Sequence, residues 1–235
     1  TKLVDYDNSV MNELRPLIKK SISDLIDQIR SKKILQTQNQ DRIDQLSLKY
    51  KKEMKQVLSK SLTDLYKDAQ SQAQAEILKS NYAKKKPIAA DKFLELVESE
   101  TFRFFRYYEY TILKRVSAEL IAAIKDGKPL SSVEGVLDDE LNELSDVQME
   151  RFARTKHTEV MNNGRLEFFK ESGVVAGYQY SAILDDVTSD ICAGLHNKKF
   201  VAGTEPIPPM HFNCRSLLVP ITKYEEFTPT ETIRG

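Results

Sequence analysis

The fold is decided near the C-terminal end, by YSAILDDVTSDIC at residues 180–192 and PPMHFNCR at residues 208–215. The stretch from 180 to 215 holds both cysteines of the chain and two of its three histidines, His196 and His211. Outside this stretch the sequence is mostly charged and helix-forming. We therefore expect residues 180–215 to form the compact, specified part of the molecule, and the helices to present it.

Composition limits the classes of function. The chain has 235 residues, of which 30% are charged, and its 35 basic and 35 acidic residues cancel. A zero net charge does not predict a global attraction to DNA or to an anionic membrane. No apolar run approaches the roughly 18 residues of a membrane span, and no signal peptide is visible, so we expect a cytoplasmic setting without membrane contact. Two cysteines make no disulfide framework and favour thiols or metal ligands.

Hydrophobic periodicity predicts four long helices with narrow apolar stripes, which favour a helical hairpin or bundle. In the first helix, Pro16 is compatible only with a first turn, so the regular helix is expected to begin at Arg15. Lys84-Lys85-Lys86-Pro87 breaks the pattern before the third helix. The expected helices span residues 9–33, 41–80, 89–125 and 138–171.

The last part of the chain changes to short extended segments. Gly177–Leu184, Lys199–Val201 and Ser216–Pro220 are predicted strands, and Thr188 or Ser189 is the expected cap of a short helix that carries Cys192. The predicted fold class is α+β, with long N-terminal helices followed by a small α+β C-terminal domain. We place the domain boundary so that residues 1–126 form a helical interaction region and residues 127–235 the C-terminal domain.

Basic and aromatic runs on the predicted helices are candidates for contact with DNA or an acidic partner. A solvated face is the plainer interpretation of the lysines. The aromatic segment Phe102–Tyr110 is interpreted as core packed against two neighbours or as a protein interface, with base stacking as the alternative. The lysines considered for contact are Lys49, Lys52, Lys55, Lys84, Lys85 and Lys86.

Three residues suggest a zinc site. Cys192, His211 and Cys214 supply the thiolate and imidazole ligands that zinc prefers, and the three-residue spacing of His211 and Cys214 is a feasible bite on a turn. A structural site needs a fourth ligand, for which the candidates are His196, His157 and Asp185. The alternatives are two small buried thiols without metal, or a disulfide under oxidising conditions.

Carboxylates near the same block invite a general acid/base hypothesis. Asp185, Asp186 and Asp190 lie at a predicted strand-to-helix turn, where such residues are more often caps. His157 and Glu159 point to different faces of a predicted helix and make a poor catalytic pair. We therefore predict no catalytic residues and no enzyme.

The order of short blocks resembles the minor head, or head morphogenesis, proteins of tailed bacteriophages, the family of phage Mu protein F. The resemblance covers roughly residues 127–221, and it ends in the specific block at 208–215. The family usually has Glu, a further Cys and a Gly where this chain has Lys156, Ser216 and Asn197-Lys198. The motif residues, to which the resemblance gives a structural role, are Arg154, Thr155, Arg165, Asp185, Thr188, Pro209 and Arg215.

The resemblance implies a virion component present in few copies, assembled in the host cytoplasm and located inside the head near the portal. Its implied partners are the portal protein, capsid or scaffolding proteins and packaged double-stranded DNA. Residues 1–126 would then be the portal- or capsid-binding region, and residues 127–235 the Mu F-like minor head domain. The alternatives are a DNA-binding virion protein, or a module with nuclease or transferase activity that uses Asp185, His211 and Arg215.

Overall fold

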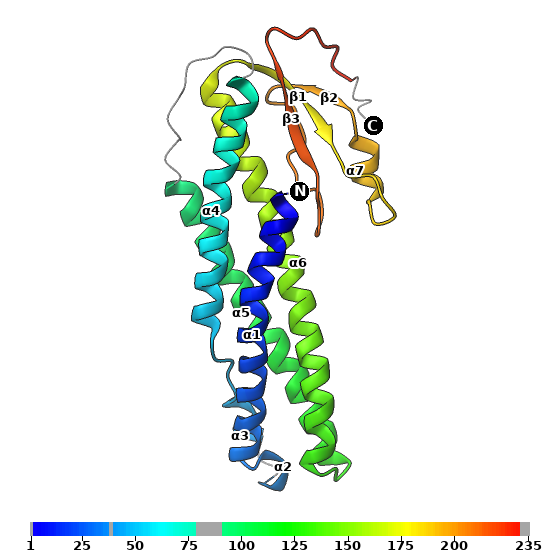
Figure 1. The fold of residues 1–235 in the computed structure, drawn as a ribbon. Helices are drawn as coiled ribbons and strands as arrows, with labels where there is room; N and C mark the ends of the chain where they lie inside the picture. The colour runs from blue at the N-terminus through cyan, green and yellow to red at the C-terminus, as the bar shows by residue number, and fades with distance from the viewer. Residues whose placement is uncertain (1, 38–39, 79–90, 231–235) are drawn as a thin grey trace. The chain divides into compact units, whose positions relative to one another are not determined.

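The computed structural model describes residues 2–37, 40–78 and 91–230 (Figure 1). It confirms the α+β fold class, because long helices are followed by a small antiparallel sheet. The described helices are α1 (Lys2–Ser31), α2 (Ile34–Thr37), α3 (Gln40–Asp44), α4 (Lys51–Leu78), α5 (Asp91–Lys125), α6 (Leu130–Ser172) and α7 (Asp190–Leu195). The strands are β1 (Val175–Ser181), β2 (Lys199–Val201) and β3 (Leu217–Thr222).

The described residues divide into two compact units, and each unit joins separate segments of the chain. Unit 1 combines Thr1–Tyr6, Ser61–Lys92 and Arg151–Gly235, and unit 2 combines Asp7–Lys60 and Phe93–Glu150. Asp126 and Gly127 lie in the turn between α5 and α6, so each unit draws on both sides of the boundary expected there. The functional division into 1–126 and 127–235 stays a prediction.

Unit 2 is a helical bundle whose core comes from apolar residues three and four positions apart. This spacing brings side chains to one face of each helix, where they interlock with those of a neighbouring helix. The fully buried residues include Leu14, Ile18, Ile22 and Leu25 from α1, Met54 and Leu58 from α4, Ile112, Val116 and Leu120 from α5, and Leu137 and Leu141 from α6. Exposed ion pairs such as Arg15 Nε–Asp146 Oδ1, at 3.0 Å, add little to stability.

The start of the first helix was predicted too late. Helix α1 begins at Lys2 and contains Pro16 in its interior. Proline removes one backbone hydrogen bond there, but Val10, Met11 and Leu14 are buried and hold the preceding turns in helical form. Tertiary packing therefore overrides the local preference of proline.

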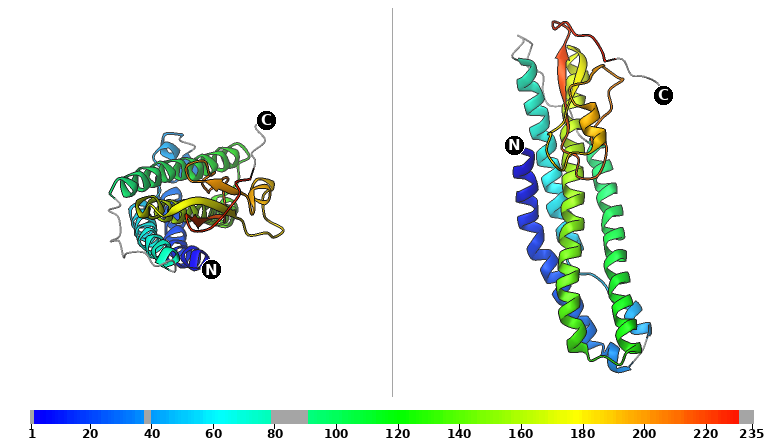
Figure 2. Two further views of the ribbon diagram at one scale, coloured as in Figure 1. Left: turned by 90° about the horizontal axis from the view of Figure 1, so that it is seen from above. Right: turned by 90° about the vertical axis from the view of Figure 1, so that its right-hand side faces the viewer.

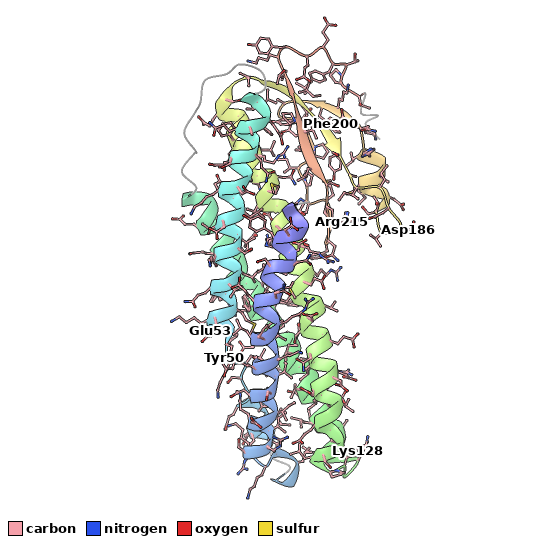
Figure 3. The ribbon with its side chains drawn as sticks, in the orientation of Figure 1. Tyr50, Glu53, Lys128, Asp186, Phe200 and Arg215 are labelled. Carbon is pink, nitrogen blue, oxygen red and sulfur yellow. The ribbon has the colours of Figure 1, made fainter. Side chains whose placement is uncertain are left out.

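The second helix was predicted as one continuous segment, but the chain leaves helical form between α3 and α4. Tyr50, labelled in Figure 3, has a positive φ of 62° just before α4 begins. Side chains of α1 bind the backbone of this break: Gln28 Nε2 donates to the Ser47 carbonyl at 2.9 Å, and Ser21 Oγ donates to the Lys49 carbonyl at 2.8 Å. These bonds replace the intrahelical ones, so the break is stable.

Two further differences concern α5 and α6. Helix α6 begins at Leu130 rather than near residue 138, because Val133 and Leu137 are buried and extend its apolar stripe. On α5, Phe105 and Tyr108 are buried as expected of a core. Three other aromatic residues of the segment are exposed and do not belong to a core: Phe102, Tyr107 and Tyr110.

Unit 1 contains a three-stranded antiparallel sheet in the order β2-β1-β3, which lies beside the second half of α6 (Figure 2). The central strand pairs Tyr178 with Phe200 of β2 and Tyr180 with Leu218 of β3. Its core includes both cysteines together with Phe168, Phe169, Tyr178, Tyr180, Phe200 and Leu218. Residues 180–215 therefore contribute Tyr180, Ala182, Cys192, Phe200 and Cys214 to a core that they share with α4, α6 and the sheet.

Side chains of α6 form hydrogen bonds with backbone groups along the outer edge of β3. Asn162 Nδ2 donates to the Ser216 carbonyl at 3.0 Å, and its Oδ1 accepts from the Leu218 amide at 3.1 Å. Arg165 donates to the Leu218 carbonyl at 3.0 Å, and Thr158 donates to the Cys214 carbonyl. An open strand edge would expose these groups to pairing with another chain, so α6 closes the sheet on this side.

Candidate functional site

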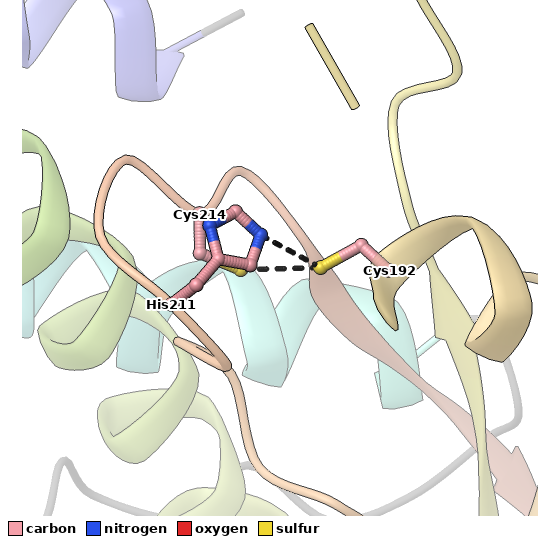
Figure 4. Close-up of side chains that lie close together, drawn as sticks. All are labelled: Cys192, His211 and Cys214. Carbon is pink, nitrogen blue, oxygen red and sulfur yellow. Dashed lines mark hydrogen bonds between the residues drawn. The ribbon is translucent and has the colours of Figure 1, made fainter. Parts of the chain in front are cut away.

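The candidate site is a cluster of Cys192, His211 and Cys214 (Figure 4). Cys192 Sγ lies 3.2 Å from His211 Nε2 and 3.7 Å from Cys214 Sγ. Both cysteines are free thiols and buried, whereas His211 is half-buried. The sequence prediction that these three residues gather at one point is therefore confirmed.

Local structure fixes the position of each of the three side chains. Ser189 caps α7, and its Oγ accepts from the Cys192 amide at 3.3 Å, which sets the start of the short helix. His211 and Cys214 lie on a turn in which Asn213 has a positive φ of 59°. This turn is tied to α6, because the Asn213 amide donates to Thr155 Oγ1 at 3.0 Å.

The tautomer of His211 follows from its backbone contact. His211 Nδ1 lies 2.7 Å from the Phe212 carbonyl oxygen, which can only accept a hydrogen bond. Nδ1 therefore carries the proton in the neutral ring, and the lone pair of Nε2 points to Cys192 Sγ. A carbonyl bound to the second ring nitrogen is the usual arrangement of a metal-binding histidine.

The surroundings of Cys192 favour its thiolate form. Burial raises the pKa of the Cys192 thiol, but hydrogen bonds outweigh burial and lower that pKa to about 7. The hydroxyl groups of Ser216, Tyr180 and Ser189 supply the largest of these hydrogen bonds. Burial also raises the pKa of Tyr180, whose hydroxyl lies 3.3 Å from Cys192 Sγ and so remains a donor to the sulfur. The thiolate is the form that binds metals.

None of the three candidates for a fourth ligand joins the cluster in the described residues. His196 Nδ1 accepts from the Ala182 amide at 3.1 Å. His157 Nε2 lies 3.2 Å from Ser61 Oγ in the buried part of α6. Asp185 binds Arg215 through two hydrogen bonds of 2.6 and 2.7 Å. The group of nearby Cys, His, Asp and Glu ligands therefore has three members.

Residues 114–219 match the family model described as Phage Mu protein F like protein. This segment contains all of α6, the cluster of Cys192, His211 and Cys214, and most of the sheet. This match supports the resemblance of this part of the chain to the phage Mu protein F-like family. The match indicates a bacteriophage protein of head morphogenesis, with a place in the virion. Comparison of the chain with curated proteins and with solved structures found no match.

Several motif residues of the Mu F-like segment form hydrogen bonds within unit 1. Thr188 Oγ1 donates to the Ile183 carbonyl at 2.6 Å and accepts from the Asp185 amide, which closes the loop before α7. Arg165 donates to β3 and to Glu76 Oε2 at 2.9 Å. Pro209 follows Pro208 through a cis peptide bond, and Arg154 is half-buried on α6. Thr155 accepts a hydrogen bond from the Asn213 amide and so holds that turn. Arg215 donates to Asp185 and so holds the loop before α7.

One contributor to the Mu F-like segment was missed by sequence reasoning. Thr158 binds the carbonyl of Cys214, and with Asn162 and Arg165 it follows helical spacing along one side of α6. A row of polar residues on a buried helix face could have indicated this role, because buried polar side chains need partners.

Replacing Arg215 by glutamine is expected to raise the pKa of Asp185. The Arg215 hydrogen bond is the largest cause that lowers this pKa from 3.8 to about 2. Because the Asp185 pKa is lower in the folded state, the ion pair stabilises the fold at pH values above the ordinary pKa of 3.8. That stability is lost as the pH falls toward about 2. A carbon NMR titration of the carboxyl group checks the shift. Lys198→Gln, which changes an exposed cation of the same unit, should leave the Asp185 pKa unchanged. Equal titration midpoints of Asp185 in Arg215→Gln and in the wild type would contradict the attribution of the low pKa to Arg215.

The lysines considered for DNA contact differ in their surroundings. Lys49 Nζ pairs with Asp24 at 2.6 Å, and Lys55 Nζ lies 4.6 Å from the centre of the Phe102 ring. Lys52 is exposed. Lys84, Lys85 and Lys86 lie outside the described residues. The Asp24 carboxylate therefore offsets the charge of Lys49, which precedes α4, whereas Lys55 on α4 keeps its charge beside an aromatic ring. None of the helices in the described part of the chain is long and apolar enough to cross a membrane.

Proposed function

We propose that the chain is a minor head protein of a tailed bacteriophage, present in few copies inside the head at the portal vertex, where it acts in head morphogenesis and in DNA packaging or ejection. The observation that carries this proposal is the family match over residues 114–219, which contains the whole block from 180 to 215. Capsid or scaffolding proteins are further proposed partners during assembly.

An exposed apolar loop in unit 1 supports a role in protein contact. It precedes and enters α7, beside the Asp185–Arg215 pair, and Asp186 in the same loop is labelled in Figure 3. Exposed apolar side chains close together often mark interaction surfaces. Its exposed residues are Ile183, Leu184, Val187 and Ile191, with Val187 77% exposed. We propose that this loop contacts the portal.

The double substitution Val187→Asp and Ile191→Asp is expected to weaken portal binding about tenfold or more, because two exposed anchors become charged. The measurement is size-exclusion chromatography of the chain co-expressed with the portal protein of the same phage, followed by titration of the two purified proteins. Val136→Asp is the matched control, since Val136 is equally apolar, is 46% exposed and lies in unit 2. Portal rings that bind neither wild type nor control would contradict portal association, whereas unchanged binding by the double variant would contradict only the proposed contact loop.

A second candidate is direct contact with packaged DNA through α5. Helical spacing places Arg103, Arg106, Tyr107, Tyr110 and Lys114 on one exposed face of this helix. Within the described residues, Arg103 and Arg106 have no ion-pair partner. Nearby carboxylates are engaged elsewhere, since Glu109 pairs with Lys51 and Glu119 with Arg115. Cations that alternate with aromatic rings suit a nucleic acid backbone and its bases.

Replacing both Arg103 and Arg106 by glutamine is expected to weaken binding to a duplex DNA fragment and to flatten its salt dependence. Loss of two phosphate contacts should reduce the slope of log affinity against log salt by about 1.8. Lys128→Gln is the control, because Lys128 pairs with Asp126 in a turn outside this face. DNA affinity that does not change with salt would contradict electrostatic contact altogether.

We propose a structural role, and no catalysis, for Asp185, His211 and Arg215. Asp185 and Arg215 are bound to each other by two hydrogen bonds, and His211 is held by the Phe212 carbonyl. A base or nucleophile must be free to reach a substrate. These contacts instead join the loop before α7 to the turn that carries His211 and Cys214.

A further inference from the structure

We propose that Cys192, His211 and Cys214 bind one zinc ion, and that its fourth ligand is an exchangeable water molecule rather than a protein side chain. This inference goes beyond the proposed head function and does not depend on it. It rests on the geometry of the three ligand atoms, on the charge of the site, and on a cavity beside the cluster.

The distances between the ligand atoms are those of a site shaped for a tetrahedral ion. With zinc–sulfur bonds of about 2.3 Å and zinc–nitrogen bonds of about 2.0 Å, a tetrahedron separates two sulfurs by about 3.8 Å and a sulfur from a nitrogen by about 3.5 Å. The two Sγ atoms here are 3.7 Å apart, and Cys192 Sγ is 3.2 Å from His211 Nε2. All three ligand atoms lie within 4.8 Å of one another, so side-chain adjustments around an ion would complete the geometry.

The ligand set suits zinc in charge as well as in type. Thiolate and imidazole together select zinc over magnesium or calcium, which prefer oxygen ligands. Binding releases the two thiol protons, so one Zn²⁺, two thiolates and a neutral imidazole carry no net charge. A neutral site is compatible with the burial of Cys192 and Cys214. The Phe212 carbonyl already holds the imidazole in the tautomer that presents Nε2.

A small cavity lies beside the cluster, and among the described residues no fourth Cys, His, Asp or Glu joins the three ligands. A cavity of about 10 Å³ lies against Cys192 and His211, which is room for about one water molecule. Polar side chains of Thr188, Ser189 and Asn213 line it and offer that water hydrogen-bond partners. Structural zinc sites are closed by four protein ligands, whereas catalytic zinc sites have three protein ligands and a water, and the site proposed here shares the coordination number of the second kind. The geometry therefore indicates an open zinc site.

The consequence of such an ion is a cross-link between two parts of unit 1. Cys192 lies on α7, and His211 and Cys214 lie on the loop between β2 and β3. Joining them fixes the loop of exposed apolar residues before α7 against the turn that α6 holds. The ion would thus order the proposed portal-contact loop without touching the partner.

The test begins with the reduced, chelator-treated wild-type chain, titrated with zinc alone and examined by elemental analysis. The expected result is about one zinc per chain, with Cys192→Ser, His211→Ala and Cys214→Ser each losing it. His196→Ala and Asp185→Asn are the matched controls, and both should keep the metal. Wild-type chain that binds no zinc at equimolar metal would overturn the proposal regardless of how the variants fold, and loss of zinc in either control would overturn the claim of an open fourth position.

Cobalt(II) in place of zinc tests the open position directly. Imidazole added to the cobalt-loaded wild type should change its visible spectrum, because it displaces the water. A tetrahedral cobalt spectrum that imidazole leaves unchanged would mean that a protein group closes the site. Neither experiment involves a portal or DNA, so failure of the zinc proposal and failure of the head function are distinguishable.

Discussion

Asn162→Ala is expected to lower the free energy of unfolding by about 2–5 kcal/mol, because it leaves two buried backbone groups at the start of β3 and just before it unpaired. The side chain of Asn162 binds the Ser216 carbonyl and the Leu218 amide, and the residue is only 1% exposed. A donor and an acceptor that have lost water on folding would then have no partner. Chemical denaturation followed by a signal from unit 1 measures the change.

Asn163→Ala is the matched control for this prediction. Asn163 is the next residue on the same helix, is half-buried, and has no contact with β3 among the described interactions. Its replacement should change stability by less than about 0.5 kcal/mol. Hydrogen exchange of the Leu218 amide adds a local readout, since only Asn162→Ala should speed it. Equal stability of the two variants would show that α6 does not hold the edge of β3.

Gly177→Ala is expected to destabilise unit 1 by about 3 kcal/mol, because the centre of the sheet has no room for a methyl group. A Cβ atom at this position would overlap the carbonyl oxygen of Phe200 on β2. It would also lie 2.5 Å from Cζ of Phe227, in the segment after β3. The ring can move, but the carbonyl belongs to the paired backbone, so β1 and β2 must separate locally.

Gly194→Ala separates this steric effect from the general effect of adding a methyl group. Gly194 lies in α7 of the same unit, and a Cβ there meets nothing within 4 Å. Alanine favours helix over glycine, so this variant should be unchanged or more stable by up to about 1 kcal/mol. Thermal unfolding of both variants checks the opposite signs, and a Gly177→Ala protein as stable as the wild type would contradict the packing around β1.

The sequence was informative wherever local pattern and packing agree. Leucine and isoleucine at helical spacing placed the long helices. The sequence left Thr188 and Ser189 as candidates for the cap of α7, and the structure shows that the cap is Ser189. Cys192, His211 and Cys214 could be brought together in prediction because few side chains have that chemistry and the two blocks flank one short module. The α+β class followed from the change in pattern near residue 173.

What could not be predicted depends on contacts between residues distant in sequence. Pro16 lies inside α1 because buried neighbours outweigh its local cost, and no pattern near Pro16 reports that burial. The break before Tyr50 is stabilised by Gln28 and Ser21, which come from another helix. A fourth ligand for the predicted zinc site could not be identified from the sequence for the same reason, since His196 and Asp185 bind other partners that only the fold reveals.

The most direct test of the head-protein account is mass spectrometry of purified phage particles that have been treated with nuclease and protease on the outside. The account predicts that peptides from both units of this chain survive the treatment, at a small fraction of the amount of the major capsid protein and together with the portal protein. Absence of the chain from both mature particles and purified procapsids, while portal and capsid proteins are detected, would contradict it.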